Sequence, residues 1–221
     1  GSHGTHVMDI AAGNGRGSGL VGVAPEADLV FVEASVNDIA WQGPDVVKNS
    51  FGDSVQMLEA IRFVFDLAGD RPCVVNLSLG TNGGPHDGSS LVEQGIDAMV
   101  SEKPNRAVVI AASNSQGDGI HTSGQVPATG LVEDIVWRVR DLVGGEAEVW
   151  FPGAKRLELS LIGPDGTVVL DALQPGNTAE IADEQGKLAV FASSRLAEPN
   201  NGDNVLGIYL APGLPGGDWT I

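Results

Sequence analysis

Two hydrophobic patterns divide the chain near residue 130. Up to about Gly124, short apolar runs typical of strands alternate with segments of helical periodicity. In the first such segment Leu58, Ile61 and Phe65 recur at i, i+3 and i+7, which places them on one helix face. The pattern predicts strands at 28–32, 72–79 and 107–112, and helices from Ser54 to near Gly69 and from Ser90 onwards. Such alternation is typical of an α/β unit, here a parallel sheet with flanking helices over residues 1–130.

Beyond Leu131 the helical periodicity is lost and strand-like runs recur between turn residues. The stretch Gly163-Pro164-Asp165-Gly166 has Pro and Gly where a tight turn needs them, and predicts a hairpin. We therefore expect an all-β sandwich or jelly roll over residues 131–221. The predicted strands cover residues 135–139, 147–151, 157–162, 167–170, 188–192 and 205–210, with the start of another at 218–221.

The charge of the chain excludes some classes of partner. Its 12 Lys and Arg residues face 29 Asp and Glu, a formal net charge of −17. Nucleic acid and anionic membrane surfaces would be repelled, so neither is expected as a partner. No apolar run reaches the eighteen or so residues of a membrane span. The single cysteine, Cys73, excludes an intrachain disulfide framework, and its apolar neighbours predict a small buried side chain.

Histidines open the chain in the order His3-Gly4-Thr5-His6-Val7. Two histidines three residues apart at the start of a helix could bind a metal ion. That interpretation needs a third ligand, and His86 and His121 lie in other loops without ligand spacing. A second interpretation is that both side chains only pack. We therefore predict no metal site at these histidines.

A third interpretation rests on resemblance. The block from His3 to Val7, followed by Ala11-Ala12-Gly13 and then Gly22-Val23-Ala24-Pro25, resembles the catalytic-histidine block of the subtilase family. The resemblance implies that His3 is the general base and that His6 is structural. It also implies a partial subtilisin-like sheet, with calcium as a family-level expectation only.

Two further blocks resemble the same family, in the family's order. Val74 to Gly80 resembles the strand that pairs with extended substrate, which implies that Ser78, Leu79 and Gly80 bind substrate. Val108 to Asn114 resembles the block that normally ends Ala-Ala-Gly-Asn, which implies substrate contacts from Ala112 and Ser113 and an oxyanion donor in Asn114. Ser113 replaces the usual glycine, and its side chain is expected to crowd the P1 pocket.

Two members of a Ser-His-Asp triad are missing from the 221 residues. The family's Gly-Thr-Ser-Met-Ala motif is absent, and Ser123, the nearest match, is interpreted as a loop residue. Asp9 lies on the helix of His3 about a turn and a half away, where its side chain points elsewhere. The segment 84–90 is interpreted as helix capping with no catalytic role. We expect a fragment whose polypeptide continues in both directions, inactive on its own, with the β region inserted before the serine block.

Three hypotheses of function remain open. The first is a serine endopeptidase that acts on peptides or proteins without a cofactor. The second is a pseudoprotease or peptide-binding interaction protein that keeps the groove without the nucleophile. The third is a ligand-binding β sandwich on an α/β scaffold. The resemblance favours a secreted or cell-envelope bacterial protein, although the sequence itself fixes neither compartment nor oligomeric state.

Overall fold

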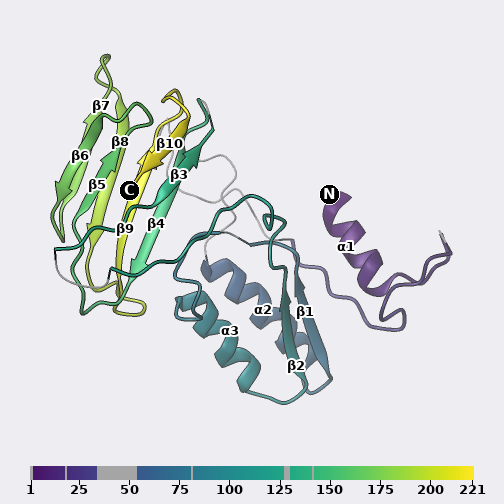
Figure 1. Cartoon of the computed structure of the whole chain (residues 1–221). Helices are drawn as coiled ribbons and strands as arrows, with labels where there is room; N and C mark the ends of the chain where they lie inside the picture. The colour runs from purple at the N-terminus through teal and green to yellow at the C-terminus, as the bar shows by residue number, and fades with distance from the viewer. Residues whose placement is uncertain (1, 18, 34–53, 81, 127–129, 141) are drawn as a thin grey trace. The chain divides into compact units, whose positions relative to one another are not determined.

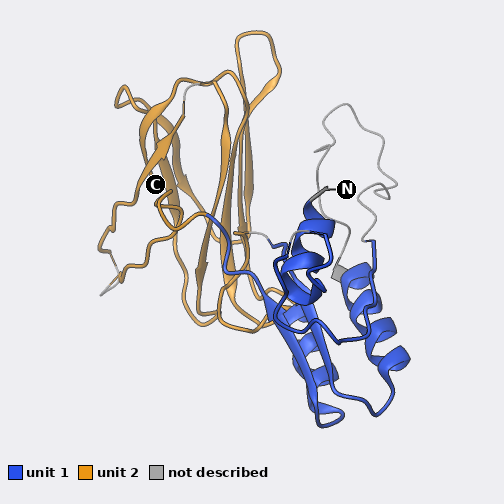
Figure 2. Ribbon diagram, turned by 90° about the vertical axis from the view of Figure 1, so that its right-hand side faces the viewer, with its two compact units in different colours: residues 1–81, 91–114 blue, residues 82–90, 115–221 orange. Residues whose placement is uncertain are grey.

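The computed structural model describes residues 2–17, 19–33, 54–80, 82–126, 130–140 and 142–221. Two compact units make up the chain (Figure 2). The α/β unit comprises Gly1–Thr81 and Leu91–Asn114, and the β unit comprises Asn82–Ser90 and Ser115–Ile221. The proposed division at residue 130 stays a prediction. However, two segments that precede residue 130 are part of the compact β unit, namely Asn82–Ser90 and the segment that begins at Ser115.

The α/β unit contains a parallel strand pair covered by two helices (Figure 1). The predicted helix from Ser54 is confirmed, and its residues Ile61 and Phe65 are almost fully buried against the strand pair. Of the three predicted strands, those at 72–79 and 107–112 are confirmed as a parallel pair. Val75 contributes from the first strand and Val108 from the second. The elements are α1 Ser2–Ala12, α2 Ser54–Ala68, β1 Cys73–Leu77, α3 Leu91–Ser101 and β2 Arg106–Ile110.

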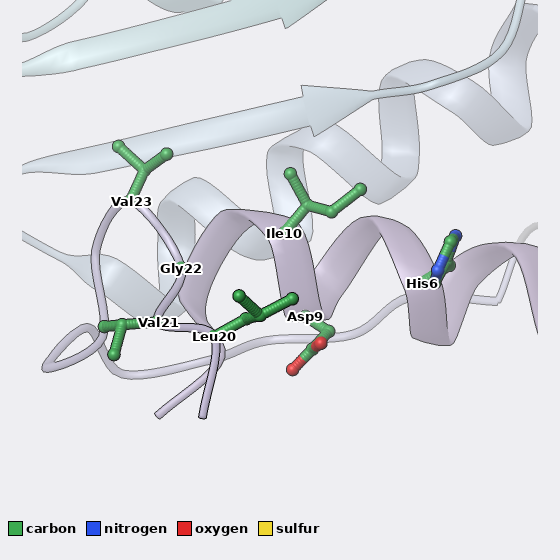
Figure 3. A pocket seen from close by; sticks show the side chains of 7 residues that line it. All are labelled: His6, Asp9, Ile10, Leu20, Val21, Gly22 and Val23. Atoms are coloured by element: carbon green, nitrogen blue, oxygen red, sulfur yellow. The ribbon is translucent and has the colours of Figure 1, made fainter. Parts of the chain in front are cut away.

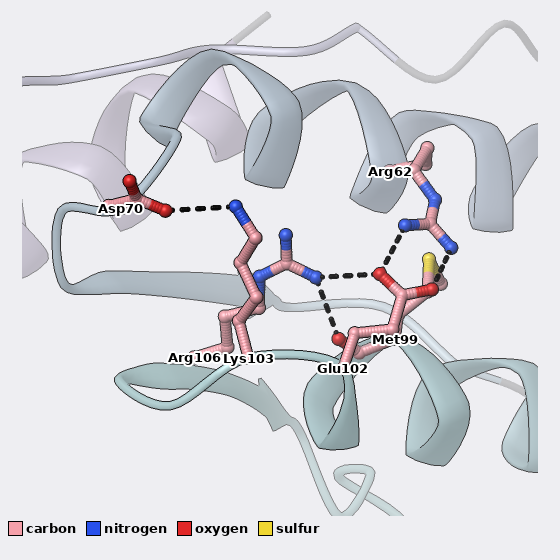
Figure 4. Close-up of polar contacts among 6 residues, drawn as sticks. All are labelled: Arg62, Asp70, Met99, Glu102, Lys103 and Arg106. Carbon is pink, nitrogen blue, oxygen red and sulfur yellow. Dashed lines mark hydrogen bonds and ion pairs between the residues drawn. The ribbon is translucent and has the colours of Figure 1, made fainter.

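A polar network fastens the two helices to the second strand (Figure 4). The Arg106 guanidinium lies 4.6 Å from the centre of the Phe65 ring and donates to the Met99 carbonyl at 2.9 Å. It also pairs with Glu102 at 3.0 Å, and Arg62 donates to both Glu102 oxygens at 2.5 and 2.6 Å. The hydrogen bond from Arg62, above all, lowers the pKa of Glu102 to about 2. The bidentate pair therefore joins the middle of α2 to the residue after the end of α3.

The predicted strand at 28–32 is wrong. These residues are not paired in a ladder, and Leu29, Val30 and Phe31 remain 54%, 40% and 61% exposed. An apolar run becomes a strand only when a neighbouring strand accepts and donates its backbone hydrogen bonds. Asp28 is instead paired with Arg71 at 2.6 Å, which ties the extended segment to the end of α2.

The β unit holds two four-stranded antiparallel sheets around one core. One sheet has the order β3-β10-β5-β6 and the other β4-β9-β8-β7. The predicted hairpin is confirmed: Gly163–Gly166 joins β5 to β6, and Gly166 has the positive φ of 85° that the turn requires. The strands are β3 Val136–Val139, β4 Gly145–Phe151, β5 Leu159–Ile162, β6 Val168–Leu173, β7 Thr178–Ala182, β8 Leu188–Arg195, β9 Asn204–Leu210 and β10 Gly217–Thr220.

One buried polar side chain ties a loop of the β unit to its core. Asn204 is fully buried, and its carbonyl oxygen accepts from the Ala197 amide at 2.9 Å. Its amide donates to the Lys155 carbonyl at 2.7 Å. Both ends of the side chain are therefore satisfied, as a buried amide requires.

Candidate active site

The substrate and oxyanion blocks begin at the same edge of the β1-β2 sheet. The two strands are parallel and in register up to Leu77 opposite Ile110. The Ala111 amide donates to the Leu77 carbonyl at 3.0 Å, so the pairing continues one step beyond the strands. A Cβ added to Gly80 would lie 4.0 Å from the Ala111 carbonyl oxygen. The structure thus brings Ser78–Gly80 beside the segment that leads to Asn114, at the carboxyl edge where open parallel sheets place their sites.

The side chains at this edge are accessible to a ligand. Asn114 and Ala112 are exposed, and Ser78 and Leu79 are half-buried. Asn76 donates to the Ser78 hydroxyl at 2.9 Å, which orients that hydroxyl at the strand end. An exposed amide held on a short segment after a paired strand can donate to a developing oxyanion.

Ser113 occupies a backbone conformation that favours glycine. Its φ is 74°, in the left-handed region that costs L-residues energy. The glycine that the family block normally has at this position would adopt this φ without strain. The local backbone therefore keeps the shape of the block although the residue differs.

Helix α1 carries His3, whose side chain is exposed. The next residue is Gly4, where a larger residue would be crowded, because a Cβ there would lie only 3.0 Å from the Phe31 ring. The Gly-rich block caps the other end of the helix. Val23 donates to the Ile10 carbonyl at 3.2 Å and Ala24 to the Ala11 carbonyl at 2.8 Å. These carbonyls would otherwise lack partners at the helix end, so the Gly-Val-Ala segment has a clear local role.

A cavity of about 380 Å³ lies between α1 and this capping segment (Figure 3). His6, Asp9 and Ile10 line it from the helix, and Leu20 to Val23 line it from the segment. His3 is not among the lining residues. The second histidine therefore faces a space near the helix cap, and the assignment of His6 as structural stays a prediction.

Hydrogen bonds and ion pairs do not connect all of the predicted site residues. Among the described residues, the recorded hydrogen bonds and ion pairs include none between His3 and Asn114, and none between His3 and Asp9. Ser123 lines a second pocket of about 150 Å³ with Glu133 and Asp134, and no histidine lines that pocket. A serine without an adjacent base has no activation, so the interpretation of Ser123 as a loop residue is retained.

Sequence reasoning missed how the segments after the two site strands are held. Residues 82–90 follow the substrate block and residues 115–126 follow Asn114, and both go with the β unit. The Gly84 amide donates to Glu148 at 2.9 Å, and Asn201 donates to Ser89 at 2.8 Å. These partners are 64 and 112 residues apart, so no local sequence signal could have found them.

Among the described residues, no cluster of three or more His, Cys, Asp and Glu side chains could hold a metal ion. The same part of the chain has no helix of the length and apolarity needed to cross a bilayer. Cys73 is a free, half-buried thiol, and burial raises its pKa. It packs against the core of the α/β unit but is only half-buried, where its neighbours predicted a buried side chain.

Comparison with known proteins decides the family. A sequence model of the subtilase family matches residues 1–136, which contain all three motif blocks. The chain belongs to the subtilase family. This subtilase is 26% identical over 198 residues to an intracellular serine protease of Paenibacillus polymyxa, covering 90% of this chain and 50% of that protein. It is 30% identical over 117 residues to the major intracellular serine protease of Bacillus subtilis strain 168, covering 53% of this chain and 30% of that protein.

A solved structure shares the fold. The Clostridium perfringens CspB protease aligns with a TM-score of 0.74 at 23% identity, over 99% of this subtilase and 45% of that chain. The chain thus spans about half the length of the Paenibacillus protein and of the Clostridium chain. Its relatives also include a minor extracellular protease of Bacillus subtilis strain 168, so family membership does not fix a compartment.

Proposed function

We propose that this chain supplies the general base and the oxyanion donor of a subtilisin-like serine endopeptidase. The supporting observation is that the Ser78–Gly80 and Ala112–Asn114 blocks start side by side at the carboxyl edge of two paired parallel strands. His3 lies on the helix of the third block. All three blocks fall within the stretch that matches the family.

Each residue would have a defined task in the reaction. An extended peptide would pair with the backbone of Ser78–Gly80 and hold the scissile bond at the sheet edge. His3 would take the proton of a serine hydroxyl and return it to the leaving amine. The Asn114 amide would donate to the oxyanion of the tetrahedral intermediate. These steps use only the backbone and side chains of the protein, so we propose no cofactor.

The nucleophile and the orienting carboxylate are not among these residues. The 221 residues contain no Gly-Thr-Ser-Met-Ala motif. We therefore propose that the isolated chain is inactive, and that a serine and an aspartate reach this site only in the full-length gene product. In the β unit, β3 pairs with β10 and β4 pairs with β9, so the first two strands lie beside the last two. This pairing supports an inserted jelly-roll-like domain.

A phosphonofluoridate serine probe and labelled casein test the proposal. The full-length product should react with the probe and hydrolyse casein, whereas the 221-residue chain should do neither. His3→Ala should abolish hydrolysis, and Asn114→Ala should lower kcat by about 10²- to 10³-fold. Asp9→Asn is the matched control on the same helix and should leave both signals unchanged.

Two outcomes contradict the proposal. If the 221-residue chain hydrolyses casein and His3→Ala stops it, a nucleophile is present that the motif search missed. If the full-length product binds casein but does not react with the probe, the second hypothesis holds, and the protein is a peptide-binding pseudoprotease.

A further inference from the structure

The outer face of one sheet of the β unit carries a row of four aligned side chains. This sheet has the order β4-β9-β8-β7 (Figure 1). Glu146 on β4 lies opposite Tyr209 on β9. Phe191 on β8 lies opposite Tyr209 on one side and opposite Glu180 of β7 on the other. Side chains directly opposite one another on a sheet face stand about 5 Å apart. The row therefore crosses all four strands and places two aromatic rings between two carboxylates.

The four side chains of the row point away from the core of the β unit. Successive residues of a strand project to opposite faces of the sheet. On β9 Ile208 and Leu210 are buried in the core, so Tyr209 between them points outwards. The same alternation turns Phe191 and both glutamates outwards. The two aromatic side chains are half-buried and the two glutamates are exposed, so a ligand can reach the row.

Both glutamates of the row lack a basic partner within the part of the chain that the structure describes. None of the ion pairs recorded there includes either of them. By contrast, Glu148, the next residue on this face of β4, accepts from the Gly84 amide and the Trp150 indole, each at 2.9 Å. Arg195, on the same face of β8, pairs with Glu198 at 3.1 Å. Those two charges have partners inside the β unit, whereas the carboxylates at the ends of the row remain available to a ligand.

The next row of the same face consists of small side chains. Gly207 on β9 lies opposite Ser193 on β8, and Ser193 lies opposite Thr178 on β7. A Cβ added to Gly207 would lie 3.0 Å from the Ser193 hydroxyl oxygen, so this position is close to full without any side chain. The aromatic rings therefore stand beside a lower strip of the face, along which a ligand would contact them.

The chemistry of the row matches a basic peptide. An aromatic ring attracts a Lys or Arg side chain over its face, and a carboxylate pairs with the same cation. The formal net charge of −17 argues against a second copy of this chain, nucleic acid or an anionic membrane as the occupant. The two carboxylates are separated by three strand spacings, about 14 Å. Residues i and i+4 of an extended peptide lie about 13 Å apart and on one face, so basic residues at this interval fit the row.

We propose that the outer face of the β4-β9-β8-β7 sheet binds an extended segment of a partner protein that carries Lys or Arg at positions i and i+4. One cation would pair with Glu146 beside the Tyr209 ring, and the other with Glu180 beside the Phe191 ring. The side chain at i+2 would rest between the two rings. This binding goes beyond the proposed peptidase function and does not depend on it, because all four residues belong to the β unit.

Fluorescence anisotropy with two short peptides tests the spacing. The first, fluorescein-labelled Gly-Arg-Ser-Leu-Ser-Arg-Gly, has arginines at i and i+4. The second, Gly-Arg-Ser-Leu-Arg-Ser-Gly, has the same composition with arginines at i and i+3, which an extended chain turns to opposite faces. The full-length product is first treated with the phosphonofluoridate probe, so that hydrolysis does not consume the peptides. The first peptide should bind about threefold more tightly than the second, a difference of one exposed ion pair.

Glu146→Gln combined with Glu180→Gln is the main variant. It should raise the Kd of the first peptide roughly 3- to 10-fold, because two exposed ion pairs are lost, and it should abolish the preference for that peptide. Glu158→Gln combined with Glu184→Gln is the matched control, since both are exposed glutamates of the β unit outside the row. It removes the same charge and should leave the Kd unchanged. The urea midpoint of tryptophan fluorescence should be the same in both double variants, which shows that the β unit is folded.

Tyr209→Leu is an independent variant that keeps apolar bulk on β9 and removes the aromatic face. It should raise the Kd of the first peptide about two- to fivefold, the size of an exposed cation–π interaction. If instead neutral chitohexaose binds the wild type and not Tyr209→Leu, while neither arginine peptide binds, the face is a glycan site and the inference is wrong.

Two further outcomes overturn the inference. If both double variants weaken binding equally, the peptide follows the overall charge of the protein and not the row. If the wild type binds the two peptides equally, the spacing argument fails. A full-length product that does not react with the probe would refute the peptidase proposal alone, because the same anisotropy series would still decide whether the face binds basic peptides.

Discussion

Replacement of Ser113 by glycine tests whether the oxyanion segment keeps a conformation built for glycine. Ser113 has a φ of 74° and is exposed, directly before Asn114. A left-handed conformation costs an L-residue roughly 1–2 kcal/mol, a cost that glycine does not have. Glycine is in turn freer in the unfolded chain, which costs about 0.5–1 kcal/mol. Ser113→Gly should therefore stabilise the α/β unit by about 0.5–1 kcal/mol.

Helical circular dichroism during urea unfolding measures this difference. All helices of the described residues lie in the α/β unit, so the helical signal reports that unit. With a denaturant slope of about 2 kcal/mol per molar, the midpoint should rise by about 0.3–0.5 M at unchanged slope. The matched control is Ala112→Gly, the neighbouring exposed residue, whose φ is not positive. It should lower the midpoint instead, because glycine there gains only unfolded-state freedom.

The two variants together can refute the reasoning. If Ser113→Gly lowers the midpoint as Ala112→Gly does, the serine is not strained, and the departure from the family block has no conformational cost. If both raise it, the effect comes from side-chain removal and not from φ.

Three other changes probe what holds each unit together. Phe65→Ala removes a fully buried ring that lies beneath Arg106, and should destabilise the α/β unit by about 3–5 kcal/mol in urea unfolding. Asn204→Ala leaves the Ala197 amide and the Lys155 carbonyl without their partner, and should cost the β unit about 2–3 kcal/mol, seen as a lower midpoint of tryptophan fluorescence. Glu102 has a pKa of about 2, below its ordinary 4.5, so its contribution is present above pH 4.5 and is lost as the pH falls toward 2. The gap in melting temperature between wild type and Glu102→Gln should therefore close over that range, and a gap that persists at pH 2 would contradict the assignment.

The hydrophobic pattern predicted those elements whose buried residues lie close together in the sequence. The helix beginning at Ser54 was found from three apolar residues on one face, and two of them, Ile61 and Phe65, are almost fully buried. The run at 28–32 was just as apolar, yet a strand needs a partner, and a sequence window cannot show whether one exists. The sequence did not predict strand β7, because the strand has only two inward positions, Ala179 and Ile181, and two apolar residues are too weak a signal.

The candidate site was predictable to the extent that motifs carry it. Family resemblance pointed to Asn114 and Ser78, and the register of the two strands then placed their segments at one edge. The structure added the left-handed φ of Ser113, which explains physically why the family block has glycine there. It also added the attachments of Glu148 and Asn201, which depend on contacts between distant parts of the chain and leave no trace in spacing or periodicity.

The exposed face of the β1-β2 sheet bears on the proposed function as well as on packing. Val75 and Val108 face the helices, so Val74 and Val109 point to the other side, where they are 66% and 52% exposed. Parallel sheets are ordinarily covered on both faces, because each crossover lays a helix on one face or the other. An additional α/β polypeptide packed on this face would bury those valines. Under the proposed function, the serine and the aspartate would lie on such a polypeptide, near the edge that carries Asn114. Burial of these two valines and the proposed catalysis would then depend on the same polypeptide.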